Sequence, residues 1–178
     1  REAIQISAEA HELVRESIAS KKNERQVQGI LEGFFLEKGA RGPAYNSIVA
    51  SGDNACILHY TSNNSPLNKG DLLLVDAGCS LTDYYNGDIT RTIPIGGKFS
   101  DEQKVIYEIV LNAQKTAIQS AIIGSNSSTV HNVALTILIE GLKEIGLLSG
   151  STEEIIENQS YKHLYMHRTG HWLGLDVH

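Results

Sequence analysis

Cysteine and proline are scarce in this sequence, with two and three copies in 178 residues. Neither Cys56 nor Cys79 belongs to a Cys-x-x-Cys pair, which argues against a zinc knuckle, and two thiols are too few for a fold built on disulfides. We expect both to be small buried residues within strands, as free cysteines often are. Free thiols agree with a reducing compartment, so we expect a cytoplasmic protein.

Long apolar runs and clusters of basic residues are also missing. No apolar stretch approaches the ~20 residues that a membrane helix needs, and the formal net charge is −6. We therefore expect neither a membrane nor a nucleic acid among the partners. The first residues, REAIQISAEAHELVRES, are charged and helix-periodic, unlike an export signal, and a chain that starts at Arg1 suggests a missing true N-terminus.

Apolar residues recur at helical spacing near both ends of the chain. The predicted helices span residues 2–20, 24–38, 100–123, 127–145 and 152–158. Gly39 stops the second of them, and Ser100 with Gln103 has the pattern of a capping box at the start of the third.

Between these helices the pattern changes to short β-branched or apolar runs separated by Gly, Asn, Asp and Pro, which predicts strands joined by turns. These runs are NSIVASG (46–52), NACILHY (54–60), DLLLVDAGCS (71–80), GDITRTIPI (87–95) and the final HWLGLDVH (171–178). The clearest turn is predicted at residues 68–71. Helices, then strands, then helices indicate an α+β domain with a mostly antiparallel sheet.

Two acids stand in these strand-forming runs. Asp76 ends LLLVD and Asp88 opens DITRT, so adjacent antiparallel strands could carry both carboxylates to one face. An ionised carboxylate buried alone costs several kcal/mol, so such acids are usually exposed, paired with a base or bound to a metal. The simpler alternative is that each caps a turn, because Asp-Ala-Gly and Asn-Gly-Asp are turn-like sequences.

Four histidines lie in or near apolar segments, namely His59, His167, His171 and His178. Each on its own is readily explained as a core residue. The His167-x-x-x-His171 spacing would suit a zinc protease helix, but the Glu of His-Glu-x-x-His is missing and Gly170 disfavours a helix. If residues 171–178 form a strand, His171 and His178 point to opposite faces unless a bulge intervenes.

These segments resemble the catalytic domain of aminopeptidase P, the Xaa-Pro aminopeptidases of the pita-bread metallopeptidase family. The resemblance runs over residues 1–178 and is carried by ILHY, LLLVDAGCSLTDYYNGDITRTIPIGGKFS and HWLGLDVH, in that order. Prolidase and methionine aminopeptidase share the fold, but DAGC and GDITRT are closer to aminopeptidase P. The resemblance implies a pita-bread α+β fold, with a mostly antiparallel sheet covered by helices, and hydrolysis of the N-terminal Xaa-Pro bond of peptides.

The resemblance also implies a role for each candidate residue. Asp76, Asp88 and His171 match metal ligands, of which Asp88 bridges two ions. His59, His167 and His178 match histidines that line the substrate pocket and assist proton transfer or hold the peptide carbonyl. The implied cofactors are two divalent ions that share a hydroxide nucleophile, with Mn²⁺ expected and Zn²⁺ or Co²⁺ as alternatives.

The family's last two metal ligands are glutamates that lie beyond the segment matching HWLGLDVH. We therefore expect residues 1–178 to be a partial catalytic metallopeptidase domain, without the N-terminal domain and the C-terminal part, that is inactive by itself and binds metal weakly. An unpaired final strand would favour a homo-oligomer. The alternatives are a prolidase-like Xaa-Pro dipeptidase, a creatinase-like hydrolase that works without metal, and a non-catalytic pita-bread binding module.

Overall fold

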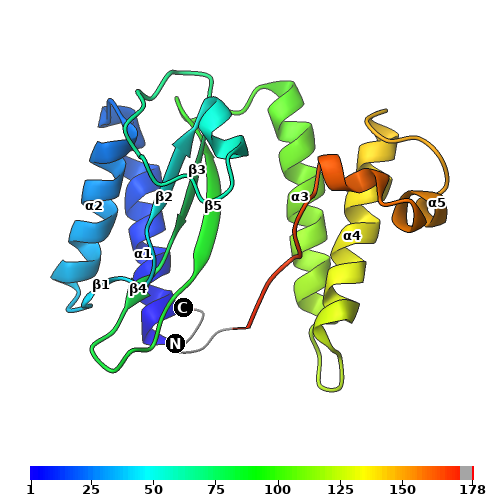
Figure 1. The fold of residues 1–178 in the computed structure, drawn as a ribbon. Helices are drawn as coiled ribbons and strands as arrows, with labels where there is room; N and C mark the ends of the chain where they lie inside the picture. Colours follow the sequence, from blue (N-terminus) through cyan, green and yellow to red (C-terminus); the bar gives the residue numbers. More distant parts are fainter. Residues whose placement is uncertain (173–177) are drawn as a thin grey trace. The chain divides into compact units, whose positions relative to one another are not determined.

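The computed structural model describes residues 1–172 and 178, and it divides into two compact units. The first unit comprises Arg1–Phe99 with Trp172–His178, and the second comprises Ser100–His171. Each unit is described by itself below (Figure 1).

The first unit packs two helices against a small antiparallel sheet (Figure 1). Its elements are α1 (Glu2–Ser17), η1 (Ile18–Ser20), α2 (Glu24–Glu37), β1 (Gly42–Pro43), β2 (Ile48–Ser51), η2 (Gly52–Cys56), β3 (Leu72–Ala77), β4 (Cys79–Ser80) and β5 (Ile89–Pro94). The two helices and the predicted turn at 68–71 are confirmed, with Asp71 N–H donating to the Asn68 carbonyl at 3.2 Å. Gly39 follows α2 with a φ of 84°, a left-handed backbone that glycine adopts at low cost.

The sheet has the strand order β2-β3-β5, and every pairing in it is antiparallel. Burial alternates along β3, with Leu73, Val75 and Ala77 fully buried in a core that also contains Leu31 and Phe35 of α2. Residues of even number in β3 therefore point to the opposite face of the sheet. Asp76 is one of them.

One predicted strand is wrong. Residues 54–60 do not form a strand, because η2 covers Gly52–Cys56 and a turn follows it. Ile57 and Leu58 are 55% and 59% exposed, so the apolar run that suggested a buried strand lies at the surface. The prediction that Cys56 is buried is wrong for the same reason, whereas Cys79 is buried in β4 as expected.

The second unit is helical. Its elements are α3 (Asp101–Ser120), α4 (Ser127–Glu144), α5 (Thr152–Glu157) and η3 (Ser160–His163). The predicted capping box of Ser100 and Gln103 is present. Helices α3 and α4 lie side by side (Figure 1), and their close approach depends on Gly141, where a Cβ would lie 2.6 Å from the Ile109 side chain. A small core of Leu135, Ile139, Leu148 and Ile155 joins α4 to α5.

The predicted final strand, 171–178, falls largely on residues 173–177, which lie outside the described residues. Among the residues that are described, no helix combines the length and the apolar character that crossing a membrane requires.

Candidate metal and catalytic site

Asp76 and Asp88 lie on the same face of the sheet, the arrangement that adjacent antiparallel strands allow. Asp76 is paired with Thr90 across β3 and β5. Asp88 stands two residues before Thr90, so its side chain projects to the same side of the sheet. Both acids are partly buried. The structure therefore favours a shared site over two separate turn caps.

Tyr45 joins the two carboxylates, and the sequence had not singled it out. Its hydroxyl oxygen is 2.6 Å from Oδ1 of Asp76 and 2.8 Å from Oδ1 of Asp88. Burial of the ring, together with the hydrogen bond to Asp76, raises the pKa of Tyr45, so the phenol stays protonated. Tyr45 comes from the loop before β2, and nothing in its local sequence marks it as a partner of acids so far along the chain.

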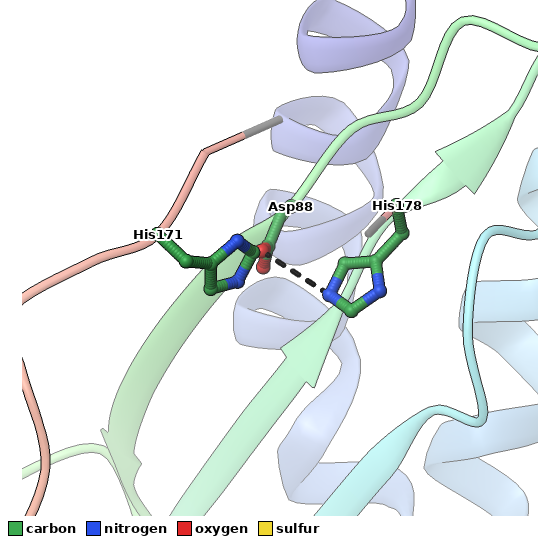
Figure 2. A group of neighbouring side chains, drawn as sticks. All are labelled: Asp88, His171 and His178. Atoms are coloured by element: carbon green, nitrogen blue, oxygen red, sulfur yellow. Dashed lines mark ion pairs between the residues drawn. The ribbon is translucent and has the colours of Figure 1, made fainter. Parts of the chain in front are cut away.

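His178 approaches the same acids. Its Nε2 is 3.6 Å from Oδ2 of Asp88 (Figure 2). Its ring lies against the ring of Tyr45, with 4.1 Å between the centroids. We call Tyr45, Asp76, Asp88 and His178 the acidic cluster. The structure thus brings three of the sequence-predicted residues together in the first unit.

Next to Asp76 and Asp88 the chain forms a tight corner, where two backbone segments approach each other closely. A Cβ at Gly78 would overlap the carbonyl of Gly87, so only glycine allows the two chain segments next to Asp76 and Asp88 to approach this closely. The Gly87 N–H donates to the Cys79 carbonyl at 2.9 Å, and the Cys79 N–H donates to Ser7 Oγ at 3.0 Å. The corner is therefore tied to α1.

His11 of α1 contacts the same corner through Ala77 and is 4% exposed. Its Nε2 donates to the Ala77 carbonyl at 3.1 Å, since a carbonyl oxygen can only accept. Its Nδ1 has no hydrogen-bond partner among the described residues. Burial lowers the pKa of His11, so the ring is held neutral in the folded protein.

The acidic cluster fits a divalent cation. A phenol carries one proton and can fully donate it to only one carboxylate at a time. The oxygen of the other carboxylate, also within 2.8 Å of the phenol oxygen, then receives no proton and is stabilised by a positive charge beside it. Carboxylate oxygens are ligands that hard divalent ions prefer, and imidazole is a common additional ligand. The side chains present therefore suit the metal that the sequence predicted.

His167 and His171 belong to the second unit and are described with it. The segment that holds them is not helical, in agreement with rejection of a zinc-protease helix. The His167 Nδ1 donates to the Arg168 carbonyl at 2.8 Å, since a carbonyl oxygen can only accept. His131 of α4 holds the segment, because its Nδ1 accepts from the Thr169 N–H at 3.3 Å.

His59 also belongs to the first unit. It is exposed, in the turn that follows η2, and its φ of 55° is left-handed. Non-glycine residues adopt such a φ at some energetic cost, so the surrounding contacts must hold this turn in place.

The profile of metallopeptidase family M24 matches residues 1–178, and the chain belongs to this family. It is 47% identical over 178 residues to the Xaa-Pro aminopeptidase of Haemophilus influenzae, covering 100% of the chain and 41% of that relative. Aminopeptidase P from Escherichia coli with the inhibitor Pro-Leu superposes with a TM-score of 0.95 at 41% identity, covering 99% of this chain and 40% of the other. Zinc-substituted Escherichia coli aminopeptidase P in complex with product gives the same TM-score and identity over the same share of each chain.

These matches confirm the α+β pita-bread fold that the sequence predicted. The chain spans about two fifths of the length of the relatives it matches.

Proposed function

We propose that the full-length protein is a metal-dependent aminopeptidase that hydrolyses the N-terminal Xaa-Pro bond of peptides, and that residues 1–178 supply part of its catalytic domain. The convergence of Asp76 and Asp88 on a single phenol hydroxyl carries this proposal, because the paired carboxylates offer a divalent cation its preferred ligands. Membership of family M24 and the Xaa-Pro aminopeptidases among the relatives support the reaction and the substrate class.

Asp76, Asp88 and His171 are the residues that would hold the two metal ions, with Asp88 shared between them. When bound, such ions would polarise the scissile carbonyl and lower the pKa of the attacking water. Mn²⁺ is the proposed ion, with Zn²⁺ and Co²⁺ as alternatives, and the zinc-substituted relative supports a site that accepts more than one metal.

The protein's own side chains would then orient the ligands and move protons. The Tyr45 hydroxyl keeps the two carboxylates turned toward each other. His178, within 3.6 Å of Asp88 and packed on Tyr45, is placed to hold a proton or to stabilise charge on the peptide carbonyl. His167 and His59 complete the set of histidines proposed to act on the substrate.

The alternatives differ in metal use and in substrate length. A creatinase-like hydrolase or a binding module has no need for two carboxylates held on one hydroxyl, so the acidic cluster argues against both. A prolidase-like enzyme would keep the metal site but cleave only Xaa-Pro dipeptides. Cleavage of Xaa-Pro tripeptides and longer peptides by the full-length protein therefore separates the proposed activity from this alternative.

Two variants of the full-length protein test the proposed roles. Asp88→Asn removes a charge that both ions would share, so it should lose metal and nearly all Xaa-Pro cleavage. His178→Ala should keep the metal and lose on the order of 10²-fold in kcat, the size expected for one acid/base or oxyanion group. Metal content, melting temperature and peptide turnover are measured for both variants. An Asp88→Asn enzyme with two metals and normal turnover would end the proposal.

Two further parts of the proposal concern the whole protein. We infer a homo-oligomer, which light scattering of the full-length protein tests directly. We also infer a cytoplasmic location, supported by the two free cysteines and tested by cell fractionation.

A further inference from the structure

Glu24, the first residue of α2, is a fully buried carboxylate with a relative exposure of 0%. It accepts five hydrogen bonds. They come from the Ser51 N–H and hydroxyl at 2.8 Å each, the Asn54 amide at 3.0 Å, the Tyr60 hydroxyl at 2.8 Å and the Ser65 N–H at 2.9 Å. All five donors are neutral groups.

These donors lie on both sides of His59 in the chain. Ser51 and Asn54 precede it, Tyr60 follows it directly, and Ser65 ends the loop. We call residues 52–65 the His59 loop. The Glu24 carboxylate thus contacts Ser51 just before the loop and Asn54 near its start. It also contacts Tyr60, next to His59, and Ser65 at the end of the loop.

Apolar burial does not hold the His59 loop, because Ile57 and Leu58 are more than half exposed. Polar contacts do this instead. Besides Glu24, Asn63 anchors the loop to the sheet, since its side chain accepts from the Val49 N–H at 3.0 Å and donates to the Ser47 carbonyl at 2.8 Å. Left-handed φ angles of 55° at His59 and 47° at Asn63 make the loop costly to hold without such contacts.

The charge state of Glu24 fits this task. Burial alone would raise the pKa of Glu24, but the hydrogen bonds from Asn54, Ser51, Ser65 and Tyr60 outweigh it, so the net pKa is lowered and the side chain stays ionised. A glutamine could not replace it. Each carboxylate oxygen meets one backbone N–H, from Ser51 on one side and Ser65 on the other, so the NH₂ of a glutamine would face an N–H in either orientation.

We propose that Glu24 is a positioning residue for peptide hydrolysis, which holds the His59 loop so that His59 reaches the substrate. This inference rests on the proposed function. It predicts that Glu24 affects turnover only through His59, whereas a residue needed merely for folding would affect turnover whether or not His59 is present.

The test is a double-mutant cycle in the full-length, metal-loaded enzyme, with Xaa-Pro peptide turnover as the readout. Glu24→Gln should lower kcat/KM on the order of 10-fold to 10²-fold, as a displaced active-site loop does. In a His59→Ala background the same change should lower it less than about 2-fold, since coupled residues are not additive. The matched control is Glu37→Gln, at the exposed last residue of the same helix α2.

Hydrogen exchange provides a second readout. Amides of residues 51–65 should exchange faster in Glu24→Gln, while those of β3 stay unchanged. If Glu24→Gln fails to fold, Tyr60→Phe removes one of the five donors, and it should show a smaller fall in kcat/KM that again disappears with His59→Ala.

The role of Glu24 would be overturned if Glu24→Gln lowered kcat/KM equally in the wild-type and His59→Ala backgrounds. Full activity of a folded Glu24→Gln enzyme would overturn it as well. Failure of the wild-type protein to cleave any Xaa-Pro peptide would instead overturn the proposed function. The two failures are distinguishable because the second appears before any variant is made.

Discussion

At the residue scale, Tyr45 explains how two acids can meet on one face of the sheet. Its hydroxyl is within 2.8 Å of an oxygen of each carboxylate, and it comes from the loop between β1 and β2. The phenol thus partly offsets the repulsion between Asp76 and Asp88 when no cation is bound. This leads to a prediction about stability that does not depend on catalysis.

Tyr45→Phe should destabilise the metal-free protein by about 1 kcal/mol, because the carboxylates lose their shared donor while the ring and its packing remain. Added Mn²⁺ should reduce the difference in unfolding free energy between Tyr45→Phe and wild type, because the cation neutralises the carboxylates in place of the lost hydrogen bonds. Urea unfolding with EDTA and with Mn²⁺ measures both effects. Tyr85→Phe, at a side chain that is 72% exposed, is the control. Equal stability of Tyr45→Phe and wild type in EDTA would contradict the prediction.

His11 should make the stability of the protein depend on pH. Its pKa is lowered by burial, so below the unfolded-state value of about 6.5 the unfolded chain binds a proton that the folded protein does not. Stability from this group is therefore present above pH 6.5 and is lost as the pH falls from there toward the lowered pKa, by at most about 1.4 kcal/mol per pH unit.

His11→Gln should flatten this dependence between pH 7 and pH 5, which urea unfolding at several pH values measures. His163→Gln, at an exposed position of η3, should leave the dependence as in wild type. If the unfolding free energies of wild type and His11→Gln changed with pH in parallel, His11 would not be the cause of the pH dependence.

At the element scale, the corner between β3 and β5 sets the spacing of the acids. A Cβ at Gly78 would overlap the Gly87 carbonyl, so Gly78→Ala must push the two segments apart. We expect a loss of more than about 2 kcal/mol in the free energy of unfolding, together with weaker Mn²⁺ binding. Urea unfolding and metal titration measure the two effects.

Gly33→Ala is the matched control for Gly78→Ala. Gly33 is exposed on α2 with nothing within 4 Å of an added Cβ, so alanine should stabilise the helix by about 0.5–1 kcal/mol. If both glycine variants had the same stability, close backbone approach at Gly78 could not be the reason for glycine there.

Local patterns predicted most elements because local physics decides them. Helical periodicity placed α1, α2, α3 and α4, and the capping box at Ser100 marked where α3 begins. The short apolar and β-branched runs that contain Asp76 and Asp88 predicted two strands, and the structure pairs β3 and β5 antiparallel. Helix α3 ends at Ser120 and not at 123, within the usual error of a boundary.

Long-range contacts decide what the sequence did not predict. The apolar run at 54–60 resembles a strand, but the chain there forms the end of η2 and a turn. Asn54 and Tyr60 of this run donate hydrogen bonds to Glu24, which is distant in the sequence. Tyr45 was missed for the same reason, since it contacts acids 31 and 43 residues away. No periodicity within a window of ten residues contains such information.

At the scale of the whole molecule, the two units differ in how their cores are built. The first has a continuous core from α1 and α2 to the sheet, whereas the core cluster of the second centres on Leu135, Ile139, Leu148 and Ile155. In α3, Val105 and Val110 are 44% and 51% exposed. Less buried apolar surface provides less stabilisation for the second unit.

Native-state hydrogen exchange of residues 1–178 should therefore show faster exchange in α3 than in β3, because local opening follows local stability. Fragment-resolved mass spectrometry gives both rates in one experiment. Gly141→Val offers a check, since its larger side chain meets Ile109 and should speed exchange in α3 and α4 without affecting β3. Slower exchange in α3 than in β3 would contradict the expected order.

The unequal burial of the two thiols provides a natural attachment point for a fluorescent dye. Cys79 is buried, and burial raises the pKa of its thiol, so little reactive thiolate forms there. Cys56 is exposed at the end of η2, three residues before His59. A maleimide dye should therefore label Cys56 first, and its emission would follow movements of this loop in real time without any engineered cysteine.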